Sequence, residues 1–453
     1  MNNTTHAGLS VKGYHAIVNG KWAHSTPTGH ALSSLLTDMI ERGFTHLWIQ
    51  DTIDIGAFEA WLEEAQPAFK LLINYKIAMK QKVGVKSLTA YRAGGGQAKL
   101  MVIFPSHSQW KFERGLAIQD VLIAVRYLET ALAVPITSSP AGGGMALLKQ
   151  INSGHDAWLE KPLTNLQELH FDSKEVAADV NWSRPVTVSE TGRKYLHKLD
   201  KNAAYLRACV EQMFGAGEPM HITSDGYQIY KNLPSVWKCS LGQLPYAPML
   251  PPRWEGGNWI AAPIVKMLLV SGVQLEIEEG YAFKEAHGTL KNWAVKLWDV
   301  RKAFRDTSLF PNTKCAEIAR DMSKSIATKT VGLSAYGHFE EDDNYKERPD
   351  FKVGAVAGNY ATMFYNMDKI AKLYNLYPVI AYTDALYYLT DHEDITLDMP
   401  DMPFNKTSLG GYKHEWTLPV DAQVLDCLNS GKAPAVQLAY LNNLVKLQSQ
   451  KAA

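Results

Sequence analysis

The stretch Asp200-Lys201-Asn202-Ala203-Ala204-Tyr205 decides how the rest of this chain is interpreted. It follows a strand-like run, 194–199, and leads into a helical pattern over 203–214. A second aspartate, Asp384, interrupts an apolar hairpin over 379–389. Strands hold carboxylates rigidly, and Mg²⁺ accepts few protein ligands, mostly oxygens. The two aspartates are therefore candidate metal ligands and catalytic residues, although either one alone is more often a turn or cap residue.

A second motif is Lys329-Thr330-Val331-Gly332-Leu333-Ser334-Ala335-Tyr336-Gly337, at the end of a helical pattern over 315–333. Seven residues span two helical turns, so Lys329 and Tyr336 share a helix face about 10 Å apart. A preceding helical pattern over 290–305 carries Arg301 and Lys302. Cations on paired helices can clamp phosphate groups.

The third motif is Ala381-Tyr382-Thr383-Asp384-Ala385-Leu386-Tyr387. In order and spacing, the three motifs resemble those of family-B DNA polymerases. The resemblance implies that Asp200 and Asp384 bind two metal ions, that the Lys201 backbone carbonyl assists, and that Tyr205 and Tyr336 shape the nucleotide pocket with Asn202. Tyr205 is the candidate for sugar discrimination. The resemblance also implies that Lys329 and Lys302 bind the triphosphate, with Arg301 as the rival of Lys302.

This chain departs from the family pattern at several positions. Tyr382 replaces the first aspartate of the third motif, Leu206 replaces a proline, and Leu333 replaces an asparagine. A register that would place Leu386 at the metal is disfavoured, because it loses a metal ligand. Downstream, Ser408–Glu415 resembles the Leu-Gly-x-x-x-x-Glu segment that closes the palm, but the Lys-x-Tyr element expected after it is not visible.

The N-terminal region alternates short apolar runs with helical patterns, which predicts a mixed α/β domain. The family carries a ribonuclease-H-like exonuclease domain here, with acidic metal ligands. The run His15–Asn19 takes the place of the first acidic motif and has no carboxylate. At the second motif Ile55 replaces the usual aspartate, with Asp51 and Asp54 as possible remnants. Two-metal hydrolysis fails without its carboxylates, so no proofreading is expected. An unrelated α/β domain is the alternative.

The expected fold class is therefore α/β and α+β: a ribonuclease-H-like domain, then a right-hand palm with helical fingers and a small thumb. The predicted boundaries are 1–185 for the exonuclease-like domain, 186–284 and 341–416 for the palm, 285–340 for the fingers and 417–453 for a short thumb. Because its palm and fingers are short, the chain is most similar to the small protein-primed polymerases of phages and linear plasmids. Low processivity follows as a hypothesis.

Local composition adds four smaller expectations. The glycine triplets at 94–96 and 142–144 are predicted as turns, the Pro- and Gly-rich segment 233–257 as irregular, and 273–277 and 281–283 as two strands. Four scattered cysteines lack CxxC spacing and are predicted to be buried thiols.

Overall composition is that of an ordinary globular protein, with 46% hydrophobic and 20% charged residues. No run approaches a membrane span and no leader is visible, so a soluble, cytoplasmic protein without membrane contact is expected. A formal net charge of zero argues mildly against nucleic-acid binding. The lysines at 76, 80, 82 and 86 could form a local basic channel, although a solvated face is favoured.

The leading hypothesis is an exonuclease-deficient DNA polymerase that uses two Mg²⁺ or Mn²⁺ ions, deoxynucleoside triphosphates and a DNA primer–template. A priming protein or processivity partner is possible. One alternative is a template-independent or priming nucleotidyltransferase on the same palm. The other is a non-catalytic DNA-binding replication protein, which Tyr382 and Leu333 favour. Paired carboxylates count against a scaffold, since they repel each other without a cation between them.

Overall fold

The computed structural model describes residues 6–10, 13–18, 21–25, 39, 42–50, 72–74, 85–91, 97–105, 108–110, 112–113, 115–153, 163, 169–171, 176, 180–241, 258–331, 348–405 and 407–452. The chain forms two compact units. The first unit comprises residues 1–154 and 299–338, and the second comprises 155–298 and 339–453. Helix α9 (Lys291–Ala303) spans the division between them.

A seven-stranded sheet organises the first unit, in the order β3-β2-β1-β4-β7-β6-β5. Strands β1 to β3 are antiparallel neighbours, whereas β4 and β7 run parallel to β1. The strands are β1 (His6–Ser10), β2 (Gly13–Val18), β3 (Lys21–Ser25), β4 (His46–Ile49), β5 (Leu72–Asn74), β6 (Val85–Tyr91) and β7 (Gln97–Ile103). The first strand is thus β1, and the run His15–Val18 that was expected to be the first strand lies in β2.

Three helices of the first unit pack together: α3 (Ile118–Leu132), α4 (Pro140–Ile151) and α10 (Thr313–Val331), with a short 3₁₀ turn at Thr307–Leu309. The prediction that Gly142–Gly144 form a turn is wrong, because all three lie inside α4. The reason is packing against α10. A Cβ added at Gly144 would lie 1.8 Å from Thr330 Oγ1, so only glycine permits this approach between the helices.

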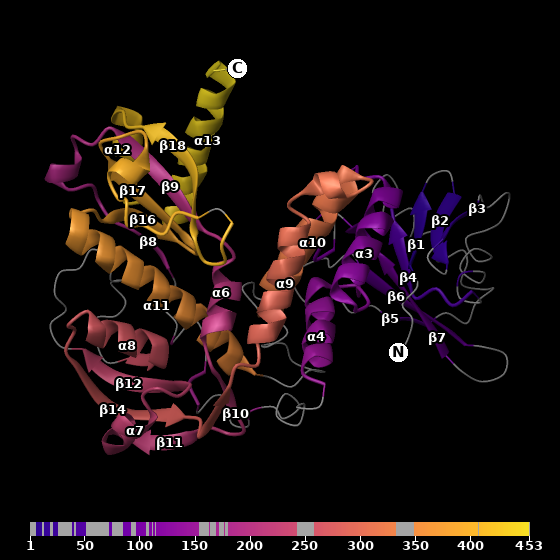
Figure 1. The fold of residues 1–453 in the computed structure, drawn as a ribbon, viewed down its shortest axis with the longest axis horizontal. Coiled ribbons are helices and arrows are strands. Elements are labelled where there is room, and N and C mark those ends of the chain that lie inside the picture. Colours follow the sequence, from indigo (N-terminus) through magenta and orange to yellow (C-terminus); the bar gives the residue numbers. More distant parts are fainter. Residues whose placement is uncertain are drawn as a thin grey trace. The chain divides into compact units, whose positions relative to one another are not determined.

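A five-stranded sheet forms the centre of the second unit, in the order β18-β9-β17-β16-β8 (Figure 1). Every pair in it is antiparallel. The strands are β8 (Asn181–Ser183), β9 (Tyr195–Lys201), β16 (Pro378–Tyr382), β17 (Ala385–Thr390) and β18 (Tyr412–Pro419). The predicted strand and hairpin are confirmed, with β9 extending through Asp200 and the hairpin turn falling at Thr383-Asp384.

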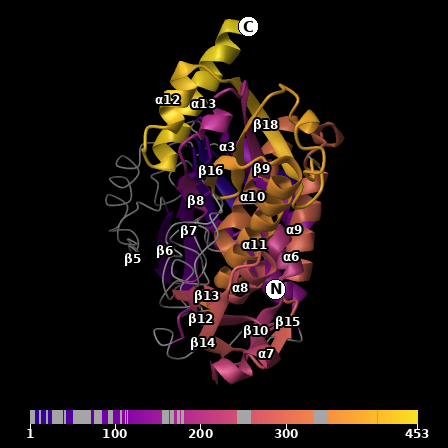
Figure 2. The same cartoon turned by 90° about the vertical axis from the view of Figure 1, so that its left-hand side faces the viewer.

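Side chains of β17 alternate between two cores, which fixes what covers each face of this sheet. Leu386 and Tyr388 point to the side of α11 (Pro349–Tyr374). Ala385, Tyr387 and Leu389 pack with α12 (Ala422–Leu428) and α13 (Pro434–Ala452). Figure 1 shows α11 below the strands, and in Figure 2 the C-terminal end of α13 extends beyond them.

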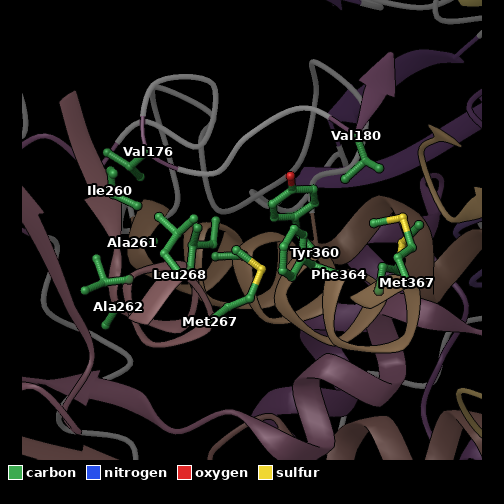
Figure 3. Packing of buried hydrophobic residues seen from close by; sticks show 14 of the residues in the cluster. Val176, Val180, Ile260, Ala261, Ala262, Met267, Leu268, Tyr360, Phe364 and Met367 are labelled. Atoms are coloured by element: carbon green, nitrogen blue, oxygen red, sulfur yellow. The ribbon is translucent and has the colours of Figure 1, made fainter. Parts of the chain in front are cut away.

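A four-stranded antiparallel sheet, β11-β14-β12-β13, completes the second unit with the two-stranded pair β10-β15. The helices and strands of this region are α6 (Ala204–Glu211), β10 (Phe214–Ala216), β11 (Met220–Thr223), α7 (Tyr227–Tyr230), β12 (Ser235–Leu241), β13 (Asn258–Ala261), α8 (Ala262–Val270), β14 (Leu275–Ala282) and β15 (Glu285–His287). Helix α8 packs against α11, where Met267 and Leu268 lie near Tyr360 and Phe364 (Figure 3).

Two predictions for this region are wrong. Segment 233–257 contains a regular strand, β12, because Ser235–Leu241 has no Pro or Gly and pairs on both edges. The two strands expected at 273–277 and 281–283 are one strand, β14, which continues through Gly280. A Cβ at Gly280 would lie 2.3 Å from the Trp237 ring, so this glycine is needed for packing and does not break the strand.

The remaining expectations on composition have mixed outcomes. All four cysteines are free and largely buried, as predicted. Within the described residues, no helix has both the length and the hydropathy of a membrane span. The glycine triplet at 94–96 and the lysines at 76, 80 and 82 lie outside the described residues.

Candidate active site

The second unit places Asp200 on one strand of its central sheet and Asp384 in the hairpin turn beside it. Asp200 is near the end of β9, and its cross-strand partner is Ala385, the residue directly after Asp384. The backbone N–H of Lys201 donates to the Asp384 carbonyl at 2.9 Å. Ala385 belongs to the core under α12 and α13, so Asp200 is on that face of the sheet. Two positions 184 residues apart in the chain are thereby fixed side by side.

The turn before Asp384 is held in an unusual conformation. Thr383 has φ 54°, in the left-handed region that a β-branched residue rarely adopts. Its N–H lies 2.9 Å from the Val180 carbonyl and 3.2 Å from Asn181 Oδ1, and its hydroxyl donates to Asp384 Oδ1 at 3.0 Å. Backbone strain of this kind persists only where surrounding contacts impose it, and it is common at functional sites.

Electrostatics at this site favour a bound cation. Burial, then the Asp384 carboxylate and then Glu415 raise the pKa of Asp200 to about 6, while Lys413 and Lys198 act in the opposite direction. The two aspartates therefore repel each other when both are ionised. A divalent ion between them would remove that repulsion.

A set of two carboxylates fits Mg²⁺ or Mn²⁺. The part of the chain that the structure describes has no group of three or more His, Cys, Asp or Glu side chains arranged for a metal ion. Mg²⁺ does not need one, because it usually keeps several waters and binds one or two carboxylates together with substrate phosphates. The hard oxygens of Asp200 and Asp384 match that chemistry.

Lys201 and Asn202, the two residues after Asp200, are held by buried hydrogen bonds. The Lys201 side chain lies on the α11 face, 1% exposed, and its Nζ donates to Asn359 Oδ1 at 3.0 Å. Only its backbone carbonyl is left as a candidate metal ligand. Asn202 is also buried: its Nδ2 donates to the Ser408 carbonyl at 3.0 Å, and its N–H donates to the Gly411 carbonyl at 2.9 Å. These bonds join the turn after Asp200 to the loop before β18.

The other predicted site residues are distributed over both units. Tyr205 lies half-buried in the first turn of α6. Arg301 and Lys302 are in the last turn of α9, where Lys302 pairs with Asp299 at 2.9 Å, and Lys329 is in the last turn of α10. These three cations belong to the first unit, and their place at the nucleotide stays a prediction. Tyr336, with Asp51, Asp54 and Ile55, lies outside the described residues.

Sequence reasoning missed two lysines beside the aspartates. Lys413 on β18 is the cross-strand partner of Asp200, and Lys198 precedes Asp200 by two residues on the same face of β9. Both form ion pairs with Glu415. The signal was present as period-2 alternation within each strand, but the pairing of β9 with β18 was needed to bring the three side chains together.

No protein-family model matches this chain, and no curated protein sequence matches it. Solved structures of phi29 DNA polymerase do match. The orthorhombic crystal form has a TM-score of 0.55 and 12% identity, over 91% of this chain and 85% of that one. The post-translocation complex with primer–template DNA has a TM-score of 0.57 and 13% identity, over 92% and 85%. The ternary complex with primer–template and incoming nucleotide has a TM-score of 0.50 and 12% identity, over 91% and 85%. At these identities the likeness is one of fold: it confirms a mixed α/β fold that resembles that of phi29 DNA polymerase, and the expected arrangement of exonuclease-like domain, palm, fingers and thumb stays a prediction.

Proposed function

We propose that this chain is a template-directed DNA polymerase that adds deoxynucleotides to a 3′-hydroxyl. The observation that carries the proposal is the pair Asp200 and Asp384, held side by side at the end of β9 and in the adjoining β16–β17 turn, where burial and then the Asp384 carboxylate raise the pKa of Asp200 to about 6. A pair that repels in this way costs stability unless a cation is bound. The likeness of the fold to phi29 DNA polymerase supports a polymerase in particular.

Asp200 and Asp384 would hold two divalent ions, with the backbone carbonyl of Lys201 as a further ligand. Such ions, about 3.5–4 Å apart, activate the attacking hydroxyl and stabilise the leaving phosphates. The role of the protein is to hold the two carboxylates in place. The strained Thr383 turn and the Lys201 N–H bond to Asp384 do this.

The partners of this site would be a DNA primer–template and deoxynucleoside triphosphates. Lys329 and Lys302, or Arg301 in place of Lys302, would bind the triphosphate. Tyr205, two residues into α6 after the Asp200 turn, would lie against the sugar. Tyr336 would pack on the base pair. Asn202 would act indirectly, because its side-chain bond to the Ser408 carbonyl holds the turn after Asp200 against the loop before β18.

The N-terminal unit supports a polymerase without proofreading. Three antiparallel strands followed by two strands parallel to the first is the order of a ribonuclease-H-like sheet, and β1, β4 and β7 follow it. Neither β1 nor β2 carries an Asp or Glu. Two-metal hydrolysis requires carboxylate ligands, so we expect no 3′–5′ exonuclease activity.

A primer-extension assay tests the function. Labelled primer–template, dNTPs and Mg²⁺ would be supplied to the wild type and to Asp384→Asn, with Asp391→Asn as the matched control at the other end of β17. We expect wild type and control to extend the primer as the template dictates, and Asp384→Asn to lose roughly 10²–10³-fold or more in rate. Extension without a template would favour a template-independent nucleotidyltransferase. No extension by the wild type with any primer, template or metal would leave the non-catalytic DNA-binding protein, for which Tyr382 in the first aspartate position argues.

A further inference from the structure

Glu415 holds two lysines on the same face of the sheet as the aspartate pair. Its Oε2 lies 2.7 Å from Lys198 Nζ, and its Oε1 lies 2.5 Å from Lys413 Nζ. Burial acts against ionisation, but hydrogen bonds from Lys198 and Lys413 keep the pKa of Glu415 below its ordinary value. The Glu415 carboxylate is therefore paired with two lysines at once, in a cluster of three side chains.

The cluster is partly shielded from solvent and its geometry is constrained. The side chains of Lys198, Lys413 and Glu415 are 20%, 43% and 25% exposed. In the register of the three strands, Lys198 is opposite Tyr387 of β17 on one side and opposite Trp416 of β18 on the other. The ring centroids of Tyr387 and Trp416 are 5.8 Å apart. Each ammonium has three donors, of which Glu415 takes one. Both lysines thus have donors left for another acceptor.

We propose that Lys198 and Lys413 bind the phosphates of the primer strand that lie next to its 3′-hydroxyl. This inference rests on the proposed function. If the hydroxyl reacts at Asp200 and Asp384, the last phosphates of the primer lie within a few ångströms of them. Lys413 is one strand spacing from Asp200, about 5 Å, and Lys198 is two residues along the strand, about 7 Å. At these distances from Asp200, both lysines are within reach of the primer phosphates next to the 3′-hydroxyl.

The position of the cluster favours the primer over the triphosphate. Asp384 follows β16 and precedes β17, on one side of β9, whereas Lys413 belongs to β18 on the other side. Lys198 is two residues from Leu196, which packs in the core of α12 and α13. Lys413 thus lies beside Asp200 on the side away from Asp384, and Lys198 lies between Asp200 and Leu196, toward the core of the C-terminal helices, where a small thumb would hold the duplex. The cations predicted for the triphosphate are on α9 and α10.

Equilibrium binding at several salt concentrations tests the inference. A fluorescent primer–template is titrated with protein at 50–200 mM salt, without dNTPs, for the wild type, Lys198→Ala, Lys413→Ala and Lys413→Arg. Lys238→Ala is the matched control, since Lys238 also pairs with glutamates, Glu278 and Glu279, but on the four-stranded sheet. Each alanine variant should bind roughly 10-fold more weakly and reduce the slope of log K against log salt by about 0.9. Lys413→Arg and Lys238→Ala should keep the wild-type slope.

The outcomes separate this inference from the proposed function. If the wild type extends primers but the alanine variants keep its affinity and salt slope, the lysines do not bind phosphate. Weaker binding with an unchanged slope would also overturn the inference, because it would show a structural ion pair. If the wild type neither binds nor extends a primer–template, the proposed function fails and this inference fails with it.

Discussion

The Nζ of Lys201 donates to Asn359 Oδ1 at 3.0 Å. Lys201 directly follows Asp200 on β9, so its side chain lies on the opposite face of the sheet. The side chains of Lys201 and Asn359 are almost completely buried, at 1% and 2% exposure. Burial lowers the pKa of Lys201 to about 8, although Glu211 and Asp384 act in the opposite direction. A lysine kept this deep in a core needs its acceptor, so the pair links β9 to α11 under the candidate active site.

Breaking this pair from either side should destabilise the protein unequally. We expect Asn359→Leu to lower the free energy of unfolding by about 3 kcal/mol, because it leaves a buried ammonium without its acceptor. Lys201→Met should cost about 1–2 kcal/mol, since it leaves only an amide unsatisfied. The double variant should cost clearly less than the sum. Urea unfolding of all four proteins measures the coupling, and strictly additive losses would show that the two residues do not interact.

The repulsion between Asp200 and Asp384 makes a prediction for the metal-free protein. A raised pKa means that the folded state loses stability as pH rises from about 4 through 6 and Asp200 ionises. Above pH 6, with EDTA present, Asp384→Asn should therefore increase the free energy of unfolding by about 1 kcal/mol. Adding Mg²⁺ should raise the melting temperature of the wild type but not of the variant. A variant less stable than the wild type in EDTA would contradict the repulsion.

His197 should make stability fall in mild acid. Burial, and then His414, lower its pKa to about 4, although the His392 backbone bond, Asp398 and Asp394 act in the opposite direction. The ring is neutral in the fold, whereas it takes up a proton near pH 6.5 when unfolded. The contribution of the neutral ring to the free energy of unfolding is fully present above pH 6.5. It decreases by up to about 3 kcal/mol as pH falls from 6.5 to about 4.

Urea unfolding between pH 4 and 7.5 measures this effect. His197→Asn should flatten the pH dependence relative to the wild type. His46, whose pKa burial lowers to about 3, contributes with the same sign and stays in both proteins, so the difference between them isolates His197. The exposed His287→Asn serves as the control and should leave the profile of the wild type unchanged. An equally steep profile in His197→Asn would exclude the buried ring as the cause.

Adjacent glycines of α4 should respond in opposite ways to alanine. Gly144→Ala would put a Cβ 1.8 Å from Thr330 Oγ1, and we expect a loss of about 2–3 kcal/mol in the first unit. Gly143→Ala meets Ile326 at 3.7 Å and Ile136 at 3.9 Å, which are ordinary van der Waals contacts, so it should be neutral or gain up to about 1 kcal/mol from helix propensity. Thermal unfolding compares the two. Thr330→Ala should partly rescue Gly144→Ala, and equal effects at both glycines would argue against the close contact.

The sequence by itself determined the strand, the hairpin and the helices that carry the predicted site residues. The apolar alternation around Asp200 and Asp384 gave the strand and the hairpin, and the 3.6-residue periodicity gave the helices that carry Lys302 and Lys329. These signals are local, since they depend on the side chains of consecutive residues. Local composition failed where packing overrides it, as at Gly144 inside α4 and in strand β12.

Tertiary structure alone decided which residues meet. Strand register pairs Asp200 with Ala385 on one side and with Lys413 on the other, and it brings Lys198 to Glu415. The tertiary structure also buries the side chains of Lys201 and Asn202, which donate hydrogen bonds to Asn359 and to the Ser408 carbonyl. Pairing between strands distant in sequence depends on the hydrophobic faces that each strand buries in its two cores. No single stretch of the chain contains that information.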